Sequence, residues 1–364
     1  MAIPSDLIVE TGLSPSLSAA ADRYLFSRPG GGGGHRTGTR PILRIYTLDR
    51  PSLLLGRYQP LPNGFPRNKS AEKIGRRLTG GRAVPAGRGF IGIAFFLPSA
   101  WDLTGDPNRI LSPDRVLNRY VRGVMRGCHR FKVRALYMGR DVLTVDHKKI
   151  ALAGFTFSKA GGVLFECHLA LSGNLGELDP SFDGAPNRES ILSSLLTPPV
   201  TSVKAEAGRD ISPREMAESI CEGSESRLGL VFEERAWTTR EKEEISRLQR
   251  EEIENGGWIE EREPRPSETS RAESEIQLGR ISVALALDKD GRIASATLAG
   301  DFLSDDRTVS ELETAFRGEA CEWTTLDALT KRVLSRPGRF ILGLGNLRVV
   351  PDTLVEAGMR TDSY

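Results

Sequence analysis

Two glycines lie between arginines in the segment Arg76–Val84, which reads RRLTGGRAV. Because glycine carries no Cβ, the backbone N–H groups of Gly80 and Gly81 can turn toward one ligand and form a concave nest that binds anions. Guanidinium groups on both sides add charge-assisted contacts to phosphate or carboxylate oxygens. The segment therefore indicates an anion-binding loop, with a basic β-turn beside the next strand as the alternative.

A lysine at the start of an apolar strand is the second candidate. Residues 141–145 and 149–155 predict a hairpin, so Lys149 begins the second strand beside Ile150. Burying an ammonium group without a counter-charge is costly, and an anionic ligand would remove that cost. The alternative is a lysine at a turn, with its head group in water.

Further short segments accompany these two candidates. In chain order the set is Gly56–Gln59 (GRYQ), Arg76–Gly81 (RRLTGG), Gly139–Val142 (GRDV), Lys149–Ala151 (KIA), Thr201–Val203, Gly300–Phe302, Glu311–Glu313 and Arg317–Gly318. Taken in order, these motifs resemble those of the lipoate–protein ligases of the biotin and lipoate ligase superfamily. The resemblance covers most of the chain, and after residue 279 it extends to the family's small accessory domain.

The resemblance implies a two-step reaction. Lipoate and ATP give lipoyl-AMP and pyrophosphate, and the acyl group then passes to a lysine of a lipoyl-carrier domain or a glycine-cleavage-H-like protein. Lys149 is the implied catalytic residue, because an ammonium between the carboxylate and the α-phosphate stabilises charge developing there. Asp141 stands where the family usually has Asn and offers an oxygen ligand for Mg²⁺. The residues implied to bind ATP and lipoyl-AMP, besides Lys149, are Arg77, Thr79, Gly80, Gly81, Arg82, Ala83 and Val84. Those implied for the acyl pocket are Leu54, Arg57, Ala151 and Ala153.

Three departures from the family pattern keep other functions open. The family's His-Asp-x-Gly-Asn stretch is replaced by residues 85–90 (PAGRGF), a glycine by Leu152, and a later His-Gly pair by Glu166 and Cys167. One alternative is an octanoyl transferase of the same fold, which needs no ATP and uses a cysteine such as Cys167 or Cys128 with a lysine. The others are a biotin ligase and a non-catalytic paralogue that binds a carrier protein.

Composition limits the classes of protein. The chain has 364 residues, 39% of them hydrophobic, and a net charge of +2, which predicts a globular protein and gives no general case for nucleic-acid binding. No apolar run approaches the roughly 20 residues that span a bilayer, and we see no secretory signal, so we expect a cytoplasmic protein with no membrane partner. Four widely spaced cysteines without a CxxC pair argue against a zinc site or a disulfide framework.

The elements that must position these residues follow from capping and periodicity. We expect helices that begin at Pro15, Pro113, Ser212 and Thr238, strands at 42–47, 52–56, 90–97 and 162–171, and a loop at the glycine run 30–34. A polar stretch predicts a linker at 256–278 between a catalytic domain (1–255) and an accessory domain (279–364). The accessory domain should contain a hairpin over 281–299 and helices from Thr308 and Thr324. The resemblance implies an α+β fold, with a central mixed or antiparallel sheet flanked by helices, plus a small α+β accessory domain.

Overall fold

The computed structural model describes residues 3–27, 40–62, 73–98, 112–159, 161–179, 195–255 and 257–360. It divides into two compact units. The first comprises Met1–Leu55, Pro62–Thr79 and Ala83–Ile259. The second comprises Glu260–Tyr364 together with two short segments from the earlier part of the chain, Gly56–Leu61 and Gly80–Arg82. The glycine run expected to form a loop, 30–34, lies outside the described residues.

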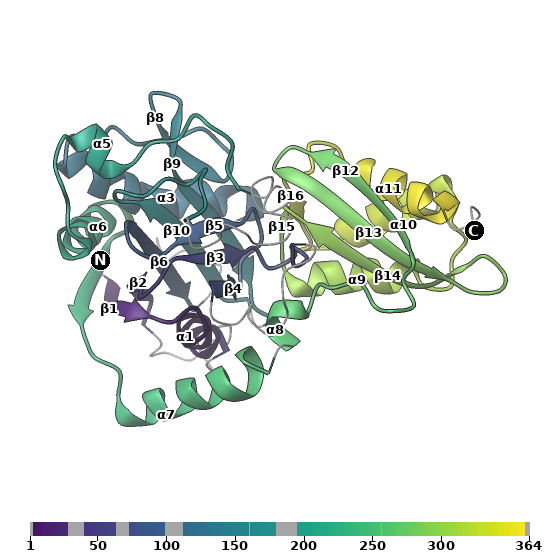
Figure 1. The fold of residues 1–364 in the computed structure, drawn as a ribbon, viewed down its shortest axis with the longest axis horizontal. Coiled ribbons are helices and arrows are strands. Elements are labelled where there is room, and N and C mark those ends of the chain that lie inside the picture. The colour runs from purple at the N-terminus through teal and green to yellow at the C-terminus, as the bar shows by residue number, and fades with distance from the viewer. Residues whose placement is uncertain are drawn as a thin grey trace. The chain divides into compact units, whose positions relative to one another are not determined.

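The first unit is built on a mixed sheet of eight strands (Figure 1). In chain order they are β1 (Ile3–Leu13), β2 (Ile42–Leu48), β6 (Phe90–Leu97), β7 (Leu136–Tyr137), β8 (Val142–Val145), β9 (Lys148–Phe157), β10 (Val163–Ala170) and β11 (Leu230–Glu234). Their order across the sheet is β11-β1-β2-β6-β10-β9-β8-β7. β1 pairs in parallel with β11 and β2, and the other neighbours are antiparallel. The strands expected at 90–97 and 162–171 are β6 and β10, and both are almost wholly buried.

Helices lie on both faces of this sheet. They are α1 (Pro15–Ser27), α3 (Pro113–Arg130), α5 (Val203–Ala207), α6 (Pro213–Leu228), α7 (Thr239–Leu248), the π-helix η2 (Gln249–Ile253) and α8 (Gly257–Glu260). α3 packs against β9 and β10, and α1 covers the opposite face, where Asp22 of α1 bonds Arg44 of β2. α3 and α6 approach closely because glycines line their contact: a Cβ on Gly223 would lie 2.5 Å from the carbonyl oxygen of Gly123. A small sheet of β3 (Ser52–Leu55), β4 (Ile74–Arg76) and β5 (Val84–Ala86), in the order β4-β3-β5, completes the unit.

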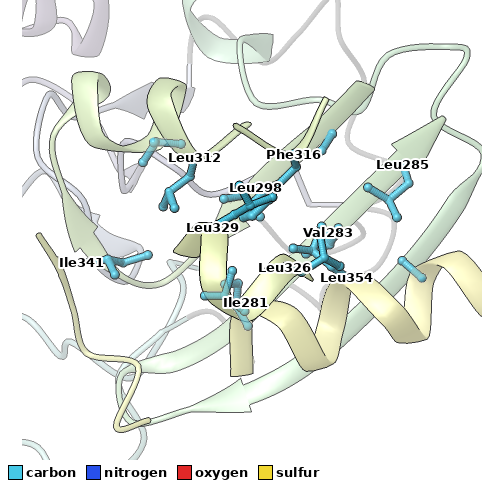
Figure 2. Packing of buried hydrophobic residues seen from close by; sticks show 14 of the residues in the cluster. Ile281, Val283, Leu285, Leu298, Leu312, Phe316, Leu326, Leu329, Ile341 and Leu354 are labelled. Atoms are coloured by element: carbon cyan, nitrogen blue, oxygen red, sulfur yellow. The ribbon is translucent and has the colours of Figure 1, made fainter. Parts of the chain in front are cut away.

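The second unit packs helices against one face of a three-stranded antiparallel sheet. Its elements are β12 (Ser270–Ile276), β13 (Gly279–Leu287), β14 (Ile293–Gly300), β15 (Leu303–Ser304), α9 (Asp306–Phe316), α10 (Trp323–Leu334), β16 (Ile341–Leu342) and α11 (Val349–Met359). Alternation along β13 sends Ile281, Val283 and Leu285 into one core with Phe316 of α9 and Leu354 of α11 (Figure 2). This α+β architecture and the mixed sheet of the first unit confirm the predicted fold class.

Several elements differ from the sequence-based expectation. The stretch 256–278, expected as a linker, contains α8 and β12, because alternating small and polar residues (SRAESEI) pair with the apolar β13. The helix expected from Thr308 begins earlier, at Asp306, since the side chain of Asp305 accepts the amide of Thr308 and caps it. The structure also contains β1 and α11, which the periodicity did not indicate. No helix in the described part of the chain is long and apolar enough to cross a membrane.

Candidate active site

Lys149 is held at a specific point by the hairpin of β8 and β9. Asp146 and His147 occupy the two-residue turn with φ angles of 46° and 65°, the left-handed pair that a type I′ hairpin turn requires. Just beyond it, Thr144 pairs with Lys149 and Leu143 pairs with Ala151, so β9 carries one extra residue there. Such a bulge bends the strand and redirects side chains. The turn and the bulge together set the direction of the Lys149 side chain.

Lys149 is bonded to the stretch 197–201 of the first unit through its ammonium group and its backbone. Its Nζ donates a hydrogen bond to the carbonyl oxygen of Thr197 at 2.6 Å. The Lys149 backbone is tied to the same stretch, because its amide donates to Pro199 (3.0 Å) and its carbonyl accepts from Thr201 (2.8 Å). Lys149 is half-buried, and its neighbour Lys148 is paired instead with Glu206.

Arg77, Thr79 and Glu166 form a buried polar group. The amide and the hydroxyl of Thr79 donate to one oxygen of Glu166, Oε2, at 3.2 and 2.5 Å. Burial raises the pKa of Glu166, and the nearby Arg77 guanidinium opposes that rise. Burial lowers the pKa of Arg77, against the attraction of Glu166, Tyr46 and Asp141. The structure therefore brings together two of the predicted residues, Arg77 and Thr79, around an acid that the sequence showed only as a departure from the family pattern. The charge of Asp141 also acts on Arg77.

The second carboxylate oxygen of Glu166, Oε1, differs from Oε2 in its hydrogen bonding. Oε1 is buried and has no hydrogen-bond partner among the described residues, and the same holds for Nε2 of His168 on the same strand. Burial, reinforced by Arg77, holds the pKa of His168 well below its usual value, so this imidazole is neutral. Buried polar atoms without a partner are uncommon, and each calls for an explanation.

A second charged cluster lies on the same face, between α1 and β2. Arg44, fully buried, donates to Asp22 and Glu10 at 2.7 Å each, and its guanidinium stacks 4.3 Å from the ring centroid of Tyr46. Burial raises the pKa of Asp22 to about 7, against the attraction of Arg44. These residues were not predicted. A charge inside the apolar strand ILRIYTL was the available signal, by the same reasoning that singled out Lys149.

A small cavity joins the two clusters. Its volume is about 10 Å³, and six of its lining residues are Asp22, Tyr46, Leu54, Arg76, Arg77 and Glu166. That volume has room for about one water-sized group. Arg77 and Leu54, two residues expected to contact ligand, therefore line one cavity of the first unit.

The alanines expected in the acyl pocket lie on the other face of the sheet. Ala153 pairs with Cys167 across the β9–β10 ladder, and Ala151 lies two residues away on the same face. Phe165, also on that face, contacts an aromatic ring of α3. Ala151 and Ala153 are therefore part of the core beneath α3. By alternation, Leu152 and Gly154 are the β9 residues on the face of the cavity.

The glycines of the predicted anion-binding loop make contacts within the second unit. The amide of Gly81 donates to the carbonyl of Phe302 at 3.0 Å, and a Cβ on Gly80 would lie 2.3 Å from the same oxygen. Arg82 donates through Nε to the carbonyl of Leu278. The two residues that follow, Ala83 and Val84, are fully buried in the first unit. The amides of Thr79 and Gly81 thus already have acceptors inside the chain, and binding phosphate with them requires those bonds to open.

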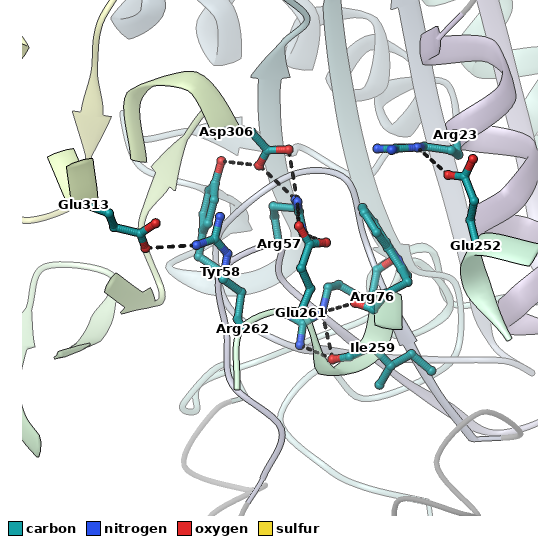
Figure 3. Close-up of polar contacts among 11 residues, drawn as sticks. Arg23, Arg57, Tyr58, Arg76, Glu252, Ile259, Glu261, Arg262, Asp306 and Glu313 are labelled. Atoms are coloured by element: carbon teal, nitrogen blue, oxygen red, sulfur yellow. Dashed lines mark hydrogen bonds and ion pairs between the residues drawn. The ribbon is translucent and has the colours of Figure 1, made fainter. Parts of the chain in front are cut away.

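Arg57 also belongs to the second unit. Its guanidinium forms a bidentate pair with Glu261, both bonds at 2.7 Å, and a second pair with Asp306 at 3.0 Å (Figure 3). The next residue, Tyr58, donates to Asp306 and stacks on Phe302 with ring centroids 4.9 Å apart. Arg57, which was expected in the acyl pocket, is therefore bound by acids of the accessory unit.

Asp141 is the carboxylate that the resemblance implies as a ligand for Mg²⁺. It is buried at the start of β8, where its carbonyl accepts the amide of Ala153 at 2.6 Å. The described residues contain no group of three or more His, Cys, Asp or Glu side chains that could hold a metal ion. Mg²⁺ usually takes one or two carboxylates and completes its shell with water and phosphate oxygens, so one aspartate is compatible with it.

The cysteines are poor nucleophiles in this structure. Cys128 and Cys167 are fully buried. Burial raises the pKa of Cys128 to about 12 and raises that of Cys167 further from neutrality. Since the thiolate is the reactive form, neither thiol is activated.

The mixed sheet and the motifs described above resemble those of the biotin and lipoate ligase superfamily. Residues 14–225 match the lipoyl protein ligase A/B catalytic domain, so the chain belongs to that family. No curated protein shows significant sequence similarity to the chain.

Several solved structures share the fold. LipL1 of P. falciparum, in complex with lipoate, has a TM-score of 0.66 at 13% identity, over 97% of this chain and 99% of that one. A bi-partite lipoate protein ligase of Thermoplasma acidophilum, studied with its E2 lipoyl domain, has a TM-score of 0.55 at 18% identity, over 72% of this chain and 98% of that one. A lipoate-protein ligase A bound with ATP has a TM-score of 0.55 at 19% identity, over 71% of this chain and 100% of that one. The first match spans nearly the whole chain, so it includes the accessory unit.

Proposed function

We propose that this protein ligates lipoate, or octanoate, to a lysine of a carrier protein, with ATP as the energy source and an acyl-AMP intermediate. Membership of the lipoyl ligase family supports it, as do similar folds solved with lipoate and with ATP. The observation that carries the proposal is the direction that a left-handed turn and a β-bulge give to Lys149, the residue that the sequence resemblance matches to the family's signature lysine.

The chemistry needs cationic groups, because a carboxylate must approach the α-phosphate of ATP. The Lys149 ammonium would lie between these two anions and stabilise the charge that develops as they react. The Arg77 guanidinium, buried beside Glu166, would bind an anionic part of the intermediate. Mg²⁺ neutralises phosphate charge when bound, and Asp141 is the residue that would hold it.

The anion-binding loop must change its hydrogen bonds for this reaction. In the present structure Thr79 donates to Glu166 and Gly81 donates to the carbonyl of Phe302. Protonation of Glu166 weakens its hold on the Thr79 amide, because a neutral carboxyl accepts less strongly than a carboxylate. The raised pKa of Glu166 supports this exchange.

Buried thiols disfavour the cysteine-dependent transferase. Cys128 lies on the buried face of α3 and Cys167 in the core beneath that helix, and both are un-ionised at neutral pH. The partner we propose is a lipoyl-carrier domain, supported by the E2 lipoyl domain paired with the Thermoplasma protein, or a glycine-cleavage-H-like protein. The proposed location is the cytoplasm.

ATP–pyrophosphate exchange with lipoate, octanoate and biotin tests the first step. The wild type should exchange with lipoate or octanoate, and Lys149→Ala should lose at least about 100-fold, the usual effect of removing a group that stabilises transition-state charge. Lys148→Ala is the matched control, since Lys148 sits one residue away on β9 and pairs with Glu206. It should keep most of the exchange.

Two outcomes would contradict the proposal. Folded wild-type protein that shows no exchange with any of the three acids would exclude the adenylation step and favour a carrier-binding paralogue. Equal loss in Lys148→Ala and Lys149→Ala would mean that the hairpin, and not the Lys149 ammonium, is what the reaction needs.

A further inference from the structure

The outer strand β7 places an exposed apolar side chain on the same face of the sheet as Lys149. β7 is the last strand in the order of the sheet, so its outer edge pairs with no other strand in the described part of the chain. Leu136 of β7 pairs with Thr144 of β8, and Thr144 pairs with Lys149 of β9. Residues paired across neighbouring strands share a face of the sheet. Because strands lie about 4.8 Å apart, the Cα atoms of Leu136 and Lys149 are separated by roughly 10 Å.

The side chains around β7 have the composition of a protein-binding surface. Leu136 and Met138 are 51% and 63% exposed, and Arg134 and Arg140, which flank them in the chain, are exposed as well. We call these four residues the β7 edge surface. Single apolar residues on a surface are common, but Met, Arg and aromatic residues together are enriched where proteins bind one another, and Tyr137 lies between Leu136 and Met138.

The β7 edge surface is basic. Residues 131–140 contain Lys132, Arg134 and Arg140 and no acidic side chain. All three cations are exposed, and none of them forms an ion pair with another described residue. Such cations attract a partner of opposite charge and raise its association rate. A second copy of this chain would present the same arginines and be repelled, so the surface favours a different, acidic partner.

The transfer step requires a carrier protein at this place. The amine nitrogen of the carrier lysine attacks the carbonyl carbon of the acyl-AMP, the bond from that carbon to the phosphate oxygen breaks, AMP leaves with the electron pair, and the amine releases a proton. The acceptor lysine must therefore reach the acyl phosphate beside Lys149. A domain of about 100 residues has a radius of gyration of about 13 Å, so a carrier in that position is large enough to cover Leu136.

We propose that the β7 edge surface is the docking surface for the carrier protein, and that the carrier presents carboxylates and an apolar side chain around its acceptor lysine. Leu136 and Met138 contact the apolar side chain, and Arg134 and Arg140 pair with the carboxylates. The inference rests on the proposed function, because it takes a carrier lysine as the acyl acceptor. It deepens that function by stating the chemistry of the carrier and the residues that select it.

Acyl transfer to an isolated E2 lipoyl domain tests the inference, with ATP, Mg²⁺ and the acid that supports exchange. Arg134→Glu and Met138→Asp should each lower kcat/KM for the lipoyl domain at least about 5-fold, mainly through a higher KM, because both weaken docking. Added salt should slow transfer by the wild type more than transfer by Arg134→Glu, since it screens the attraction that this variant has lost.

A second assay needs no carrier. Hydroxylamine converts the acyl-AMP into a hydroxamate, so hydroxamate formation measures the first step and also shows that each variant is folded. Arg134→Glu and Met138→Asp should form hydroxamate at the rate of the wild type. Their matched controls are Arg227→Glu, at an exposed residue of α6, and Val231→Asp, at a residue of β11 that is 45% exposed on the opposite edge of the same sheet. Both controls should behave as the wild type in both assays.

Unchanged transfer by Arg134→Glu and Met138→Asp would overturn the inference. So would an equal loss of transfer in the two controls, or a parallel loss of hydroxamate, which would assign these residues to the first step. Wild-type protein that forms neither hydroxamate nor exchanged ATP would refute the proposed function instead. Calorimetric binding of the lipoyl domain without ATP then decides the inference by itself: weaker binding by the two variants than by the controls supports it, and equal binding overturns it.

Discussion

Glu166 and Arg77 are opposite charges buried in the first unit, and each changes the proton affinity of the other. Desolvation favours the neutral acid, whereas the guanidinium favours the carboxylate. Desolvation wins, so the folded protein binds a proton at Glu166 more tightly than the unfolded chain does. Stability that depends on this proton is present at low pH and is lost as pH rises above about 4.5, the value of an unperturbed glutamate.

A pH series on Glu166→Gln measures this linkage. The free energy of unfolding of the wild type, relative to that of the variant, should decrease as the pH rises above about 4.5, because glutamine cannot take up the proton. Denaturant unfolding at several pH values gives both curves. Glu311→Gln is the control: the Arg339 guanidinium, bonded to Glu311, lowers the pKa of that acid to about 2, so its titration is complete below pH 5. Parallel curves for wild type and Glu166→Gln would refute the raised pKa.

The sequence predicted individual residues where one side chain violates its local pattern. Lys149 stood out as a charge at the start of an apolar strand and Arg77 as a charge beside two glycines, and in the structure Arg77 lines the cavity. Glu166 stood out only as a departure from the family, since its partner Thr79 is 87 positions away in the chain. Ala151 and Ala153 could not be assigned to a face, because β9 is apolar on both sides and alternation has no polar reference there.

The hairpin of β8 and β9 is the element on which the proposed reaction depends. Its turn residues, Asp146 and His147, both have positive φ. For residues other than glycine, the left-handed conformation costs about 1–2 kcal/mol of conformational free energy. The cost is smaller for aspartate than for histidine, because the short aspartate side chain can form local hydrogen bonds. The turn is therefore strained at His147, although its shape is the one that suits the twist of the strands.

His147→Gly should relieve that strain. We expect a gain of about 1 kcal/mol in the free energy of unfolding, with ATP–pyrophosphate exchange unchanged, because the favoured Asp-Gly turn keeps the direction of β9. His147→Ala is the matched control, since it removes the imidazole but keeps the Cβ and its strain. If both variants were equally stable, the imidazole and not the backbone conformation would determine the energetics of the turn.

Element types were predictable where caps or strict alternation were present. Ser212 and Thr238 form the capping boxes expected from their sequence, and α6 and α7 begin directly after them. β12 was assigned to a linker because its sequence is polar, and it becomes a strand through the tertiary pairing with β13. Local propensity therefore identifies elements that stabilise themselves, and not those that depend on a neighbour.

At the scale of the whole molecule, the two units do not correspond to two continuous stretches of chain. Gly56–Leu61 precedes the accessory sequence by about 200 positions, yet Tyr58 is fully buried in the core of the second unit with Phe302 and Leu312. The chain cannot be divided near residue 255 without removing that tyrosine from its core. The main break in the chain, between Ile259 and Glu260, lies inside the expected linker. The sequence-based division left Gly56–Leu61 out of the second unit, since nothing in the GRYQ segment itself indicates a distant partner.

Tyr58→Ala should therefore destabilise the second unit, although Tyr58 lies in the first part of the sequence. Losing a large aromatic side chain from a core costs about 3–5 kcal/mol, so amides of β13 and β14 should exchange with solvent correspondingly faster. Tyr120→Ala is the matched control, because Tyr120 is equally buried but packs in the first unit against Phe95 and Phe165. It should accelerate exchange in β6 and β10 and leave β13 and β14 protected. Hydrogen exchange followed by mass spectrometry resolves both regions. If Tyr58→Ala opened β6 and β10 while β13 and β14 stayed protected, the GRYQ segment would have to be assigned to the first unit, and Arg57 would return to the residues considered for the acyl pocket.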